Sequence, residues 1–492
     1  MISSCPRLVV AGTHSGVGKT SVTLALVSAL KQRGLKVQCF KVGPDYLDPT
    51  YLKLASNRPC YNLDGWMMGR RYVQSLFTAR CGDADIAVVE GVMGLYDGAY
   101  PTTPEGSTAE LARWLEAPVI LVVNVHGMAG SVAALVKGYA ELDGAPAIRG
   151  VIANRCGSDV HREWIREAVR AFHLPMVVGT VPRGAFPDLR SRHLGLVTAD
   201  GRNLATATLT ALGATLEAHA SVDEILRIAR SPVARTRTTT SGTSLGRTAE
   251  GLAGGKSGAE EHAGHVEVTT TTAFPCADPS RVRLGVAFDE AFHFYYQDNL
   301  DALEAGGAEL VRFSPVHDVA VPVRLDALYL GGGYPEEHAH ALSKNESMLE
   351  SVREFVKAGR PVYAECGGLM YLSQAIERLD GTHYAQVGLL PCRTRMLRCL
   401  KSLGYVEVTL AADSLFGPEG SRLRGHEFHY SELVNDPLET DDWQAVYRAQ
   451  RRRGGDVSPE GFQRGNVLAS YCHLHFASCP GAVEHFLGRC RV

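Results

Sequence analysis

A glycine-rich loop near the start of the chain sets the fold class of its first domain. Residues 12–20 read GTHSGVGKT, after the apolar run RLVVA and before a helical stretch at residues 21–33. Five residues, rather than the usual four, separate Gly12 from Gly18, so the loop is a variant of the phosphate-binding P-loop. A strand that leads through such a loop into a helix is typical of an α/β domain that binds a nucleotide.

Apolar runs alternate with helical stretches through the first 230 residues. Strand-like runs lie at residues 7–11, 36–40, 86–90, 119–123 and 150–154. Strands separated by helices predict a parallel sheet covered on both faces. The α/β pattern starts again near residue 281, with short runs at residues 284–288, 327–330 and 362–364. We therefore predict an ATP-binding domain over residues 1–230 and a second α/β domain over residues 281–492.

Residues 231–280 have a different composition. They contain TRTTTSG and TTTT and few large apolar residues. Such a segment cannot bury enough apolar surface to offset the entropy lost on ordering. We predict a flexible linker between the two domains.

The bulk composition excludes several classes of function. The formal net charge of -3 over 492 residues gives no basic field for nucleic acid. No apolar run reaches the roughly 18 residues of a membrane span, and the first residues do not resemble a secretion signal. The 12 cysteines are scattered without a Cys-x-x-Cys pair, as expected of reduced thiols in the cytoplasm.

The P-loop predicts how the phosphates are held. Lys19 is expected to neutralise the terminal phosphates, and the Thr20 hydroxyl is expected to bind Mg²⁺. The other nucleotide-binding candidates of the loop are Gly12, Thr13, Gly16 and Gly18.

Acidic residues follow two of the predicted strands. Glu90 ends an apolar strand and is the expected second Mg²⁺ partner, although a strand-end acid can also cap a turn. Asp45 and Asp48 lie in KVGPDYLDP, where glycine and proline favour a rigid turn that can orient a metal or a substrate. Ordinary turn chemistry explains Gly-Pro-Asp equally well.

A second constellation lies in the C-terminal domain. Cys366, in AECGG, follows a strand-like run and resembles a nucleophile elbow, with the start of the next helix favouring a thiolate. His473, in HLHF, is the candidate base, and His475 is placed on the same strand face to orient it. The N–H groups of Gly333 and Gly367 are candidates for an oxyanion hole. The alternative is a buried structural cysteine.

The order of the motifs resembles the cobyrinic acid a,c-diamide synthase family. The motifs are GTHSGVGKT, KVGPDYLDPTY, NLDGWM, VVEGVMGLYDG, LGGGYPE, AECGGLMYL and SYCHLHF. The resemblance covers nearly the whole chain outside the linker. It implies a dethiobiotin-synthetase-like ATP domain, followed by a class I glutamine amidotransferase domain.

The resemblance also implies the reaction and its partners. The a and c acetate carboxylates of cobyrinic acid, a corrin polycarboxylate, would be amidated through acyl phosphates, with ATP and Mg²⁺ required and L-glutamine as nitrogen donor. This step belongs to cobalamin biosynthesis. A homodimer is left open.

Residue roles carry over where the motifs match. Cys366 is implied as the glutaminase nucleophile and His473 as its base. Many triad amidotransferases have a glutamate two residues after the base, where this chain has His475, so the third member stays open. The family's substrate motif matches Asp45, Tyr46, Leu47, Asp48 and Asp97. The implied metal ligands are Thr20, Asp45 and Glu90, and Lys41 and Asn154 complete the nucleotide-binding candidates.

Three alternatives accompany this interpretation. A ParA/MinD-type ATPase switch carries a lysine in KGGVGKT where this chain has His14, and it has no use for the C-terminal domain. Cobyric acid synthase shares the architecture, but its base motif is of the His-Gly-x-Phe type. The nickel-sirohydrochlorin a,c-diamide synthase shares nearly every motif and is not separated by the sequence.

Overall fold

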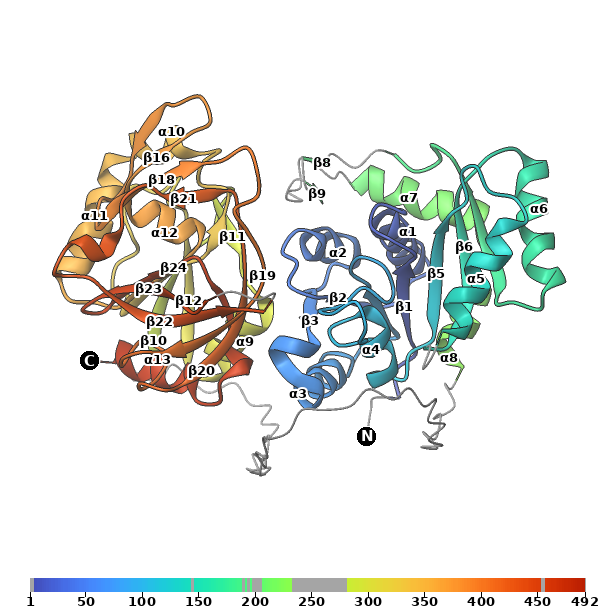
Figure 1. Ribbon diagram of the computed structural model, residues 1–492, viewed down its shortest axis with the longest axis horizontal. Coiled ribbons are helices and arrows are strands. Elements are labelled where there is room, and N and C mark those ends of the chain that lie inside the picture. Colours follow the sequence, from blue (N-terminus) through green and yellow to red (C-terminus); the bar gives the residue numbers. More distant parts are fainter. Residues whose placement is uncertain are drawn as a thin grey trace, which may run out of the picture. The chain divides into compact units, whose positions relative to one another are not determined.

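The structure is a computed structural model (Figure 1). It describes residues 4–142, 146–187, 191–192, 195–196, 206–231, 281–452 and 456–491. The predicted linker at 231–280 lies outside the described residues apart from Ser231. The domain boundaries drawn from the sequence therefore stay predictions.

The N-terminal region forms a parallel sheet, as predicted. Its strand order is β3-β2-β4-β1-β5-β6-β7, and every neighbouring pair is parallel. The strands are β1 (Arg7–Gly12), β2 (Val37–Val42), β3 (Tyr61–Leu63), β4 (Ile86–Glu90), β5 (Val119–Asn124), β6 (Ile148–Cys156) and β7 (Met176–Pro182). The five predicted strands are confirmed, whereas β3 and β7 were not predicted.

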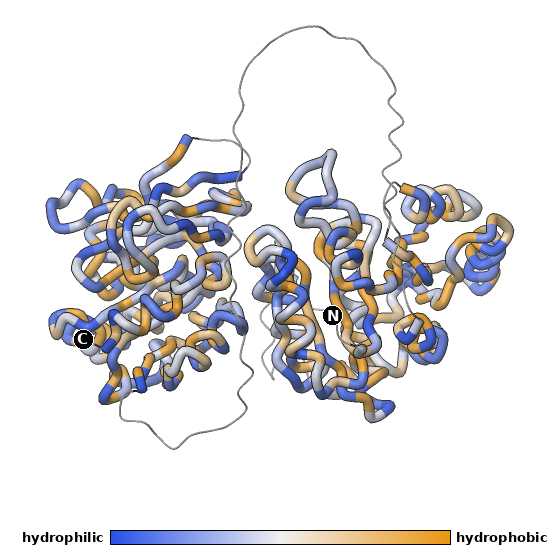
Figure 2. Tube along the Cα trace, turned by 90° about the horizontal axis from the view of Figure 1, so that it is seen from below, coloured by the Kyte–Doolittle hydropathy of each residue, from blue (hydrophilic) through white to orange (hydrophobic). Residues whose placement is uncertain are grey.

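Helices cover both faces of this sheet. Along β1, Leu8 and Val10 enter one core, and Val9 and Ala11 enter the other, because successive strand side chains alternate between faces. The first core includes side chains from α1 (Lys19–Gln32), α2 (Asp48–Ser56), α7 (Thr206–His219) and α8 (Val222–Arg230). The second includes side chains from α3 (Gly65–Arg80), α4 (Thr108–Trp114), α5 (Ser131–Glu141) and α6 (Asp159–Ala171). Figure 2 shows the hydrophobic residues concentrated along the interior strands.

The strand order gathers the predicted nucleotide residues at one edge of the sheet. Strand β4 lies between β1 and β2, and all three run in the same direction. Their carboxyl ends carry the P-loop, Glu90 and Lys41. This edge, where the chain order reverses beside β1, is where α/β sheets bind ligands.

The C-terminal region contains a mixed sheet of ten strands. Its order is β12-β10-β13-β15-β24-β23-β22-β19-β20-β25. The strands are β10 (Val282–Ala287), β12 (Ala308–Phe313), β13 (Ala327–Leu330), β15 (Val362–Glu365), β19 (Ser402–Leu410), β20 (Arg422–His429), β22 (Gln444–Arg451), β23 (Ser458–Arg464), β24 (Val467–Ser470) and β25 (His473–His475). The first five in spatial order are parallel and include the three predicted strands. The antiparallel half was not predicted.

Shorter elements complete this region. Its helices are α9 (Gln297–Ala305), α10 (Ala339–Lys344), α11 (Glu346–Lys357), α12 (Gly367–Leu372) and α13 (Ala482–Cys490), with 3-10 turns at Pro437–Glu439 and Phe476–Ser478. The small sheets contain β11 (Phe292–Phe294), β14 (Gly332–Gly333), β16 (Ser373–Glu377), β17 (His383–Ala385), β18 (Leu390–Met396) and β21 (Ser431–Leu433), and in the N-terminal region β8 (Ser191–Arg192) and β9 (Gly195–Leu196). Within the described ranges, we find no helix with the length and apolar character that crossing a bilayer requires.

The last strand of the ten-stranded sheet, β25, lies against the end of β15 in the middle of the strand order. Only two residues separate β24 from β25, yet β25 pairs with β20 at the far edge. The backbone N–H of Leu474 in β25 donates to Oε1 of Glu365 in β15 at 3.0 Å. His473 is thereby held beside the carboxyl end of β15, where Cys366 follows.

Candidate active site

The P-loop is held in shape by its glycines and by Asn154. Gly18 has a φ of 100°, and an added Cβ would lie 2.3 Å from Nδ2 of Asn154. That Nδ2 donates to the carbonyl of Val17 at 2.8 Å, and Oδ1 accepts from the N–H of Arg155. The Asn154 side chain therefore holds the loop at Val17 and Gly18. Its contact with the nucleotide stays a prediction.

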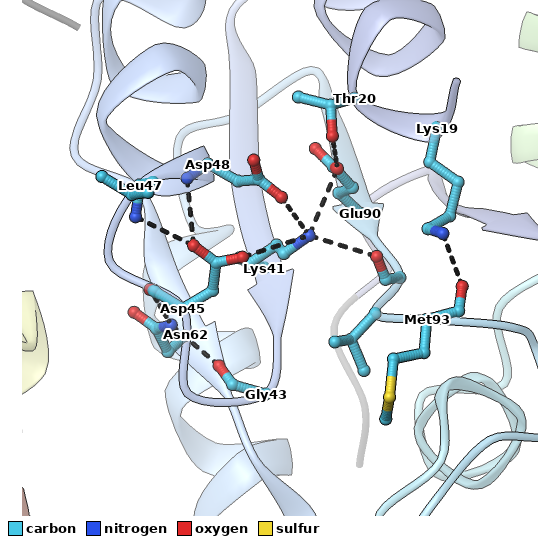
Figure 3. Close-up of polar contacts among 12 residues, drawn as sticks. Lys19, Thr20, Lys41, Gly43, Asp45, Leu47, Asp48, Asn62, Glu90 and Met93 are labelled. Carbon is cyan, nitrogen blue, oxygen red and sulfur yellow. Dashed lines mark hydrogen bonds and ion pairs between the residues drawn. The ribbon is translucent and has the colours of Figure 1, made fainter. Parts of the chain in front are cut away.

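Lys19 begins α1 and is buried at the strand edge. Its Nζ donates to the carbonyl of Met93 at 2.5 Å and to that of His14 at 3.3 Å (Figure 3). Burial, together with the nearby positive charge of Lys41, lowers the pKa of Lys19 to about 8. Among the described residues, the hydrogen bonds of this buried ammonium go to two carbonyls, which leaves it capacity for an anion.

Thr20 and Glu90 meet as the sequence predicts. The Thr20 hydroxyl donates to Oε1 of Glu90 at 2.7 Å. Glu90 is fully buried, and no hydrogen-bond partner for its Oε2 is found among the described residues. Burial outweighs the attraction of Lys41 and raises the pKa of Glu90 to about 7. A buried acceptor without a partner, beside a hydroxyl, fits a hard cation.

Lys41 joins the acidic residues into one cluster around its buried ammonium. Its Nζ lies 2.5 Å from Asp48 Oδ2, 3.2 Å from Glu90 Oε1 and 3.8 Å from Asp45 Oδ2 (Figure 3). Burial lowers the pKa of Lys41, but the carboxylates of Asp48 and Glu90 outweigh that effect and raise it. Lys41, Asp45 and Asp48, from one predicted motif, therefore share a site with Glu90 from another.

Asp45 also shapes its own turn. Its Oδ1 accepts from the N–H groups of Leu47 at 2.8 Å and Asp48 at 3.1 Å. Burial and the charge of Asp48 raise the pKa of Asp45 to about 6. In the described part of the chain, no three His, Cys, Asp or Glu side chains are grouped so as to hold a metal ion. The predicted role of Asp45 as a metal ligand is thus untested, and its turn-forming role is observed.

Asp97 lies in the loop after β4. Its Oδ2 accepts from the N–H of Gly94 at 2.7 Å, one residue after the carbonyl that binds Lys19. Asp97 is exposed, and its charge acts on Lys19. It therefore lies in the loop that also holds Lys19, outside the cluster around Lys41.

Cys366 lies on a sharp turn between β15 and α12. Its φ of 48° and ψ of -96° are unusual for a residue with a side chain, and its N–H donates to the carbonyl of Ser470 at 2.7 Å. A Cβ on Gly367 would lie 3.0 Å from the backbone N of Gly333. The strained turn and this close approach are the features expected of a nucleophile elbow beside an oxyanion hole.

His473 is buried beside Cys366. Burial lowers the pKa of His473, but the charge of Cys366 and its hydrogen bond to the imidazole, with a further contribution from Glu365, raise the value to about 10. The imidazole stacks on His426 with ring centroids 5.0 Å apart. Cys366 and His473, predicted from motifs about a hundred residues apart, are therefore neighbours.

The contacts of His475 are with side chains other than His473, and its predicted orienting role stays untested. Its ring packs 4.9 Å from that of Tyr296, and its Nε2 is 3.8 Å from Asp298 Oδ2. Burial lowers the pKa of His475 to about 3. The carboxylate nearest His473 is instead that of Glu365, whose Oε2 is 3.9 Å from Nδ1. The sequence analysis missed Glu365 because its place beside His473 depends on contact between β15 and β25, which are distant in the chain.

Tyr46 has an unexpected environment. Its ring stacks on Phe294 at 5.2 Å with an interplanar angle of 8°, and its centroid is 5.2 Å from that of His473. The hydroxyl is buried, and no hydrogen-bond partner for it is found in the described ranges. A residue predicted to handle substrate therefore contacts the predicted glutaminase base.

Two family models match the chain. Residues 8–196 match the CobQ/CobB/MinD/ParA nucleotide binding domain. Residues 283–480 match the CobB/CobQ-like glutamine amidotransferase domain. The two matches coincide with the two sheets.

Curated relatives match over nearly the full length. A protein of Syntrophotalea carbinolica named cobyrinate a,c-diamide synthase is 54% identical and covers 99% of each chain. A protein of Leptospira interrogans with the same name is 41% identical, over 99% of this chain and 98% of its own. One of Dehalococcoides mccartyi, again with that name, is 42% identical over 98% and 97%.

Proposed function

The chain belongs to the cobyrinate a,c-diamide synthase family, and from this premise we propose how its two sites divide the reaction. The activity is ATP-dependent amidation of the a and c acetate carboxylates of cobyrinic acid, with ammonia released from glutamine. The observation that carries the proposal is the presence in one chain of the Lys19–Thr20–Glu90 cluster and the Cys366–His473 pair. The first suits phosphoryl transfer and the second amide hydrolysis.

The N-terminal site activates the carboxylate. A carboxylate resists ammonia because its carbon is a poor electrophile and oxide is a poor leaving group. A substrate carboxylate oxygen attacks the γ-phosphorus of ATP, ADP leaves, and an acyl phosphate forms. Lys19, buried at the edge of the sheet, stabilises the charge that develops during this transfer. Ammonia then attacks the carbonyl carbon, and phosphate leaves.

Thr20 and Glu90 would hold Mg²⁺ in this site. Glu90 offers the buried oxygen without a partner, and Thr20 lies 2.7 Å from the other oxygen. The chemistry that Mg²⁺ supplies when bound is neutralisation of phosphate charge. Lys41 and Asp48 would set the charge around the substrate carboxylate.

The C-terminal site releases ammonia. His473 takes the thiol proton of Cys366, the thiolate attacks the side-chain amide carbon of glutamine, and a thioester forms as ammonia leaves. Water then hydrolyses the thioester to glutamate. The N–H groups of Gly333 and Gly367 are proposed to stabilise the oxyanion.

Tyr46 is proposed to couple the two sites. Its ring lies against His473, while its neighbours Asp45 and Asp48 bracket the Lys41 ammonium. Ammonia must stay out of water, which would protonate it to unreactive ammonium. A side chain that contacts His473, on a turn whose Asp45 and Asp48 flank Lys41, is well placed to couple hydrolysis to amidation.

The variant Tyr46→Ala should separate glutamine hydrolysis from amidation. Removing the ring opens the space beside His473, so the ratio of glutamate formed to amide formed should rise severalfold. Tyr46→Phe, which keeps the ring and loses only the unpartnered hydroxyl, should keep most of the coupling. The measurement is glutamate and diamide from the same reaction, and an unchanged ratio in Tyr46→Ala would remove Tyr46 from the transfer.

The variants Asp48→Asn and Asp97→Asn should impair amidation but not glutamine hydrolysis. Asp48 is bonded to Lys41, and Asp97 acts on Lys19, so each change removes a charge from the acyl-phosphate site. We expect the diamide rate to fall by about a hundredfold, with some monoamide accumulating. Asp83→Asn, at an exposed aspartate paired with Arg58, is the matched control. Full diamide yield at the normal rate would mean that Asp48 and Asp97 only cap turns and have no role in amidation.

One experiment tests the substrate. Purified protein is incubated with ATP, Mg²⁺, glutamine and either cobyrinic acid or nickel-sirohydrochlorin, and the product masses are compared. A gain of two amide groups on cobyrinic acid supports the proposal, whereas products from nickel-sirohydrochlorin alone would overturn it.

The relatives do not favour the nickel-sirohydrochlorin alternative or the ATPase switch. A cytoplasmic location and a homodimer stay predictions.

A further inference from the structure

Glu365 is a buried carboxylate placed at the junction of three strands. It ends β15, directly before Cys366, and only 1% of it is exposed. Its Oε2 accepts from the Tyr329 hydroxyl at 2.8 Å, and its Oε1 accepts from the Tyr363 hydroxyl at 2.5 Å. Oε1 also accepts from the N–H of Leu474, next to His473, at 3.0 Å. Three donors fix the position of the carboxylate and offset its burial.

The imidazole of His473 faces this carboxylate with an unsatisfied nitrogen. Nδ1 of His473 is buried, and the described residues offer it no hydrogen bond. The nearest acid is Glu365, with Oε2 at 3.9 Å. A shift of about 1 Å would turn this contact into a charge-assisted hydrogen bond of normal length. His426 stacks on the imidazole and the Tyr46 ring lies tilted against it, so these aromatic neighbours hold the ring beside Glu365.

We propose that Glu365 is the third member of the glutaminase triad, the positioning residue that holds the Nδ1 proton of His473. With Nδ1 donating to Glu365, Nε2 is left to accept the thiol proton of Cys366. The thiolate then bonds to the glutamine amide carbon, the carbon–nitrogen bond breaks, and the Nε2 proton passes to the departing ammonia. Glu365 keeps its negative charge throughout and stabilises the imidazolium between these two proton transfers. This role rests on the glutaminase half of the proposed function.

His475 is not suited to stabilise the imidazolium of His473. Its ring packs on Tyr296, and its Nε2 lies near Asp298 of α9. Burial keeps its pKa low, at about 3, so it is a neutral side chain at ordinary pH. A neutral imidazole cannot stabilise an adjacent imidazolium as a carboxylate does. The position two residues after the base is therefore not the source of the acid in this chain.

The test is the pH dependence of Cys366 alkylation. Unmodified protein and Glu365→Gln are treated with iodoacetamide from pH 5 to 10, and modification of the peptide that carries Cys366 is followed by mass, since the chain has 12 cysteines. Glutamine keeps the shape of the side chain but removes the charge that stabilises the thiolate–imidazolium pair. The inflection should move to higher pH by about one unit or more. Glutaminase kcat should fall by about a hundredfold with KM for glutamine little changed, and ammonia-dependent amidation should persist.

Two further variants keep the test decisive. Glu365→Asp retains the charge on a shorter side chain, so the inflection should return part of the way toward that of the unmodified protein. Glu460→Gln removes another buried carboxylate of the same sheet, bonded to Ser470 and the N–H of Tyr471, and should leave the inflection in place. An unmoved inflection in a Glu365→Gln protein that still amidates with ammonia would overturn the proposal. So would a shift in His475→Gln that is absent from Glu365→Gln. Failure of the unmodified protein to hydrolyse glutamine would instead reject the proposed function.

Discussion

Replacing Cys366 with alanine should abolish glutamine-dependent amidation and leave ammonia-dependent amidation close to that of the unmodified protein. In the proposed mechanism, the Cys366 sulfur is the protein atom that bonds to glutamine. Its loss should therefore reduce the glutaminase rate by at least about three orders of magnitude. Nothing in the acyl-phosphate chemistry requires it, since Lys19, Thr20 and Glu90 belong to α1 and β4 of the N-terminal region. The measurement is diamide formation with glutamine and, separately, with a high concentration of ammonium salt at alkaline pH.

A second cysteine provides the control for Cys366→Ala. Cys392 is buried in the same hydrophobic core as Cys366, and the mechanism does not use it. Cys392→Ala should therefore match any packing effect while retaining glutamine-dependent activity. Loss of ammonia-dependent amidation in a folded Cys366→Ala protein would mean that Cys366 belongs to the synthetase site or that the reaction does not have two sites.

The elements predicted correctly from the sequence are those with local signals. Glycines, a lysine and an apolar run define the P-loop within about a dozen residues, and the observed helix begins at Lys19. The prediction that Lys19 and Glu90 share a site also follows from topology, because parallel strands place their carboxyl ends on one edge. The same reasoning places Lys41 and Asp48 near that edge, but it does not predict that their side chains contact each other.

The features missed by sequence analysis depend on contacts between distant segments. The backbone N–H of Leu474 reaches Glu365, 109 residues earlier in the chain, because five antiparallel strand pairings lead from β24 to β25. Such pairings follow from register and strand twist, which no short motif records. Tyr46 was predicted to handle substrate, but its contact with His473 has no sequence signal at all. His475 was predicted from its spacing alone, and spacing does not record its contacts with Tyr296 and Asp298.

Replacing Lys19 with alanine should stop amidation from both nitrogen sources. Lys19 is the cation at the start of α1, and the carbonyls of Met93 and His14 hold it in place. Without it, the transferred phosphoryl group loses the positive charge proposed to stabilise it, and the rate should fall by about a thousandfold or more. Basal glutamine hydrolysis should persist, because no step at Cys366 uses ATP. Lys36→Ala, at an exposed lysine of the same domain, is the matched control.

The pH dependence of ATP use distinguishes a phosphate-binding lysine from one that only supports the loop. Burial and the charge of Lys41 lower the pKa of Lys19 to about 8, so the ligand-free protein loses this positive charge as the pH rises through that value. Since kcat/KM reports the groups of the free enzyme, kcat/KM for ATP in ammonia-dependent amidation should decline above about pH 8 in the unmodified protein. The residual activity of Lys19→Ala should lack this decline, because the titrating group is gone. Two results would contradict a role of Lys19 in phosphoryl transfer: a near-normal rate of ammonia-dependent amidation in Lys19→Ala, or the same alkaline decline in that variant. Lys19 would then have only the structural role of bonding the carbonyls of Met93 and His14.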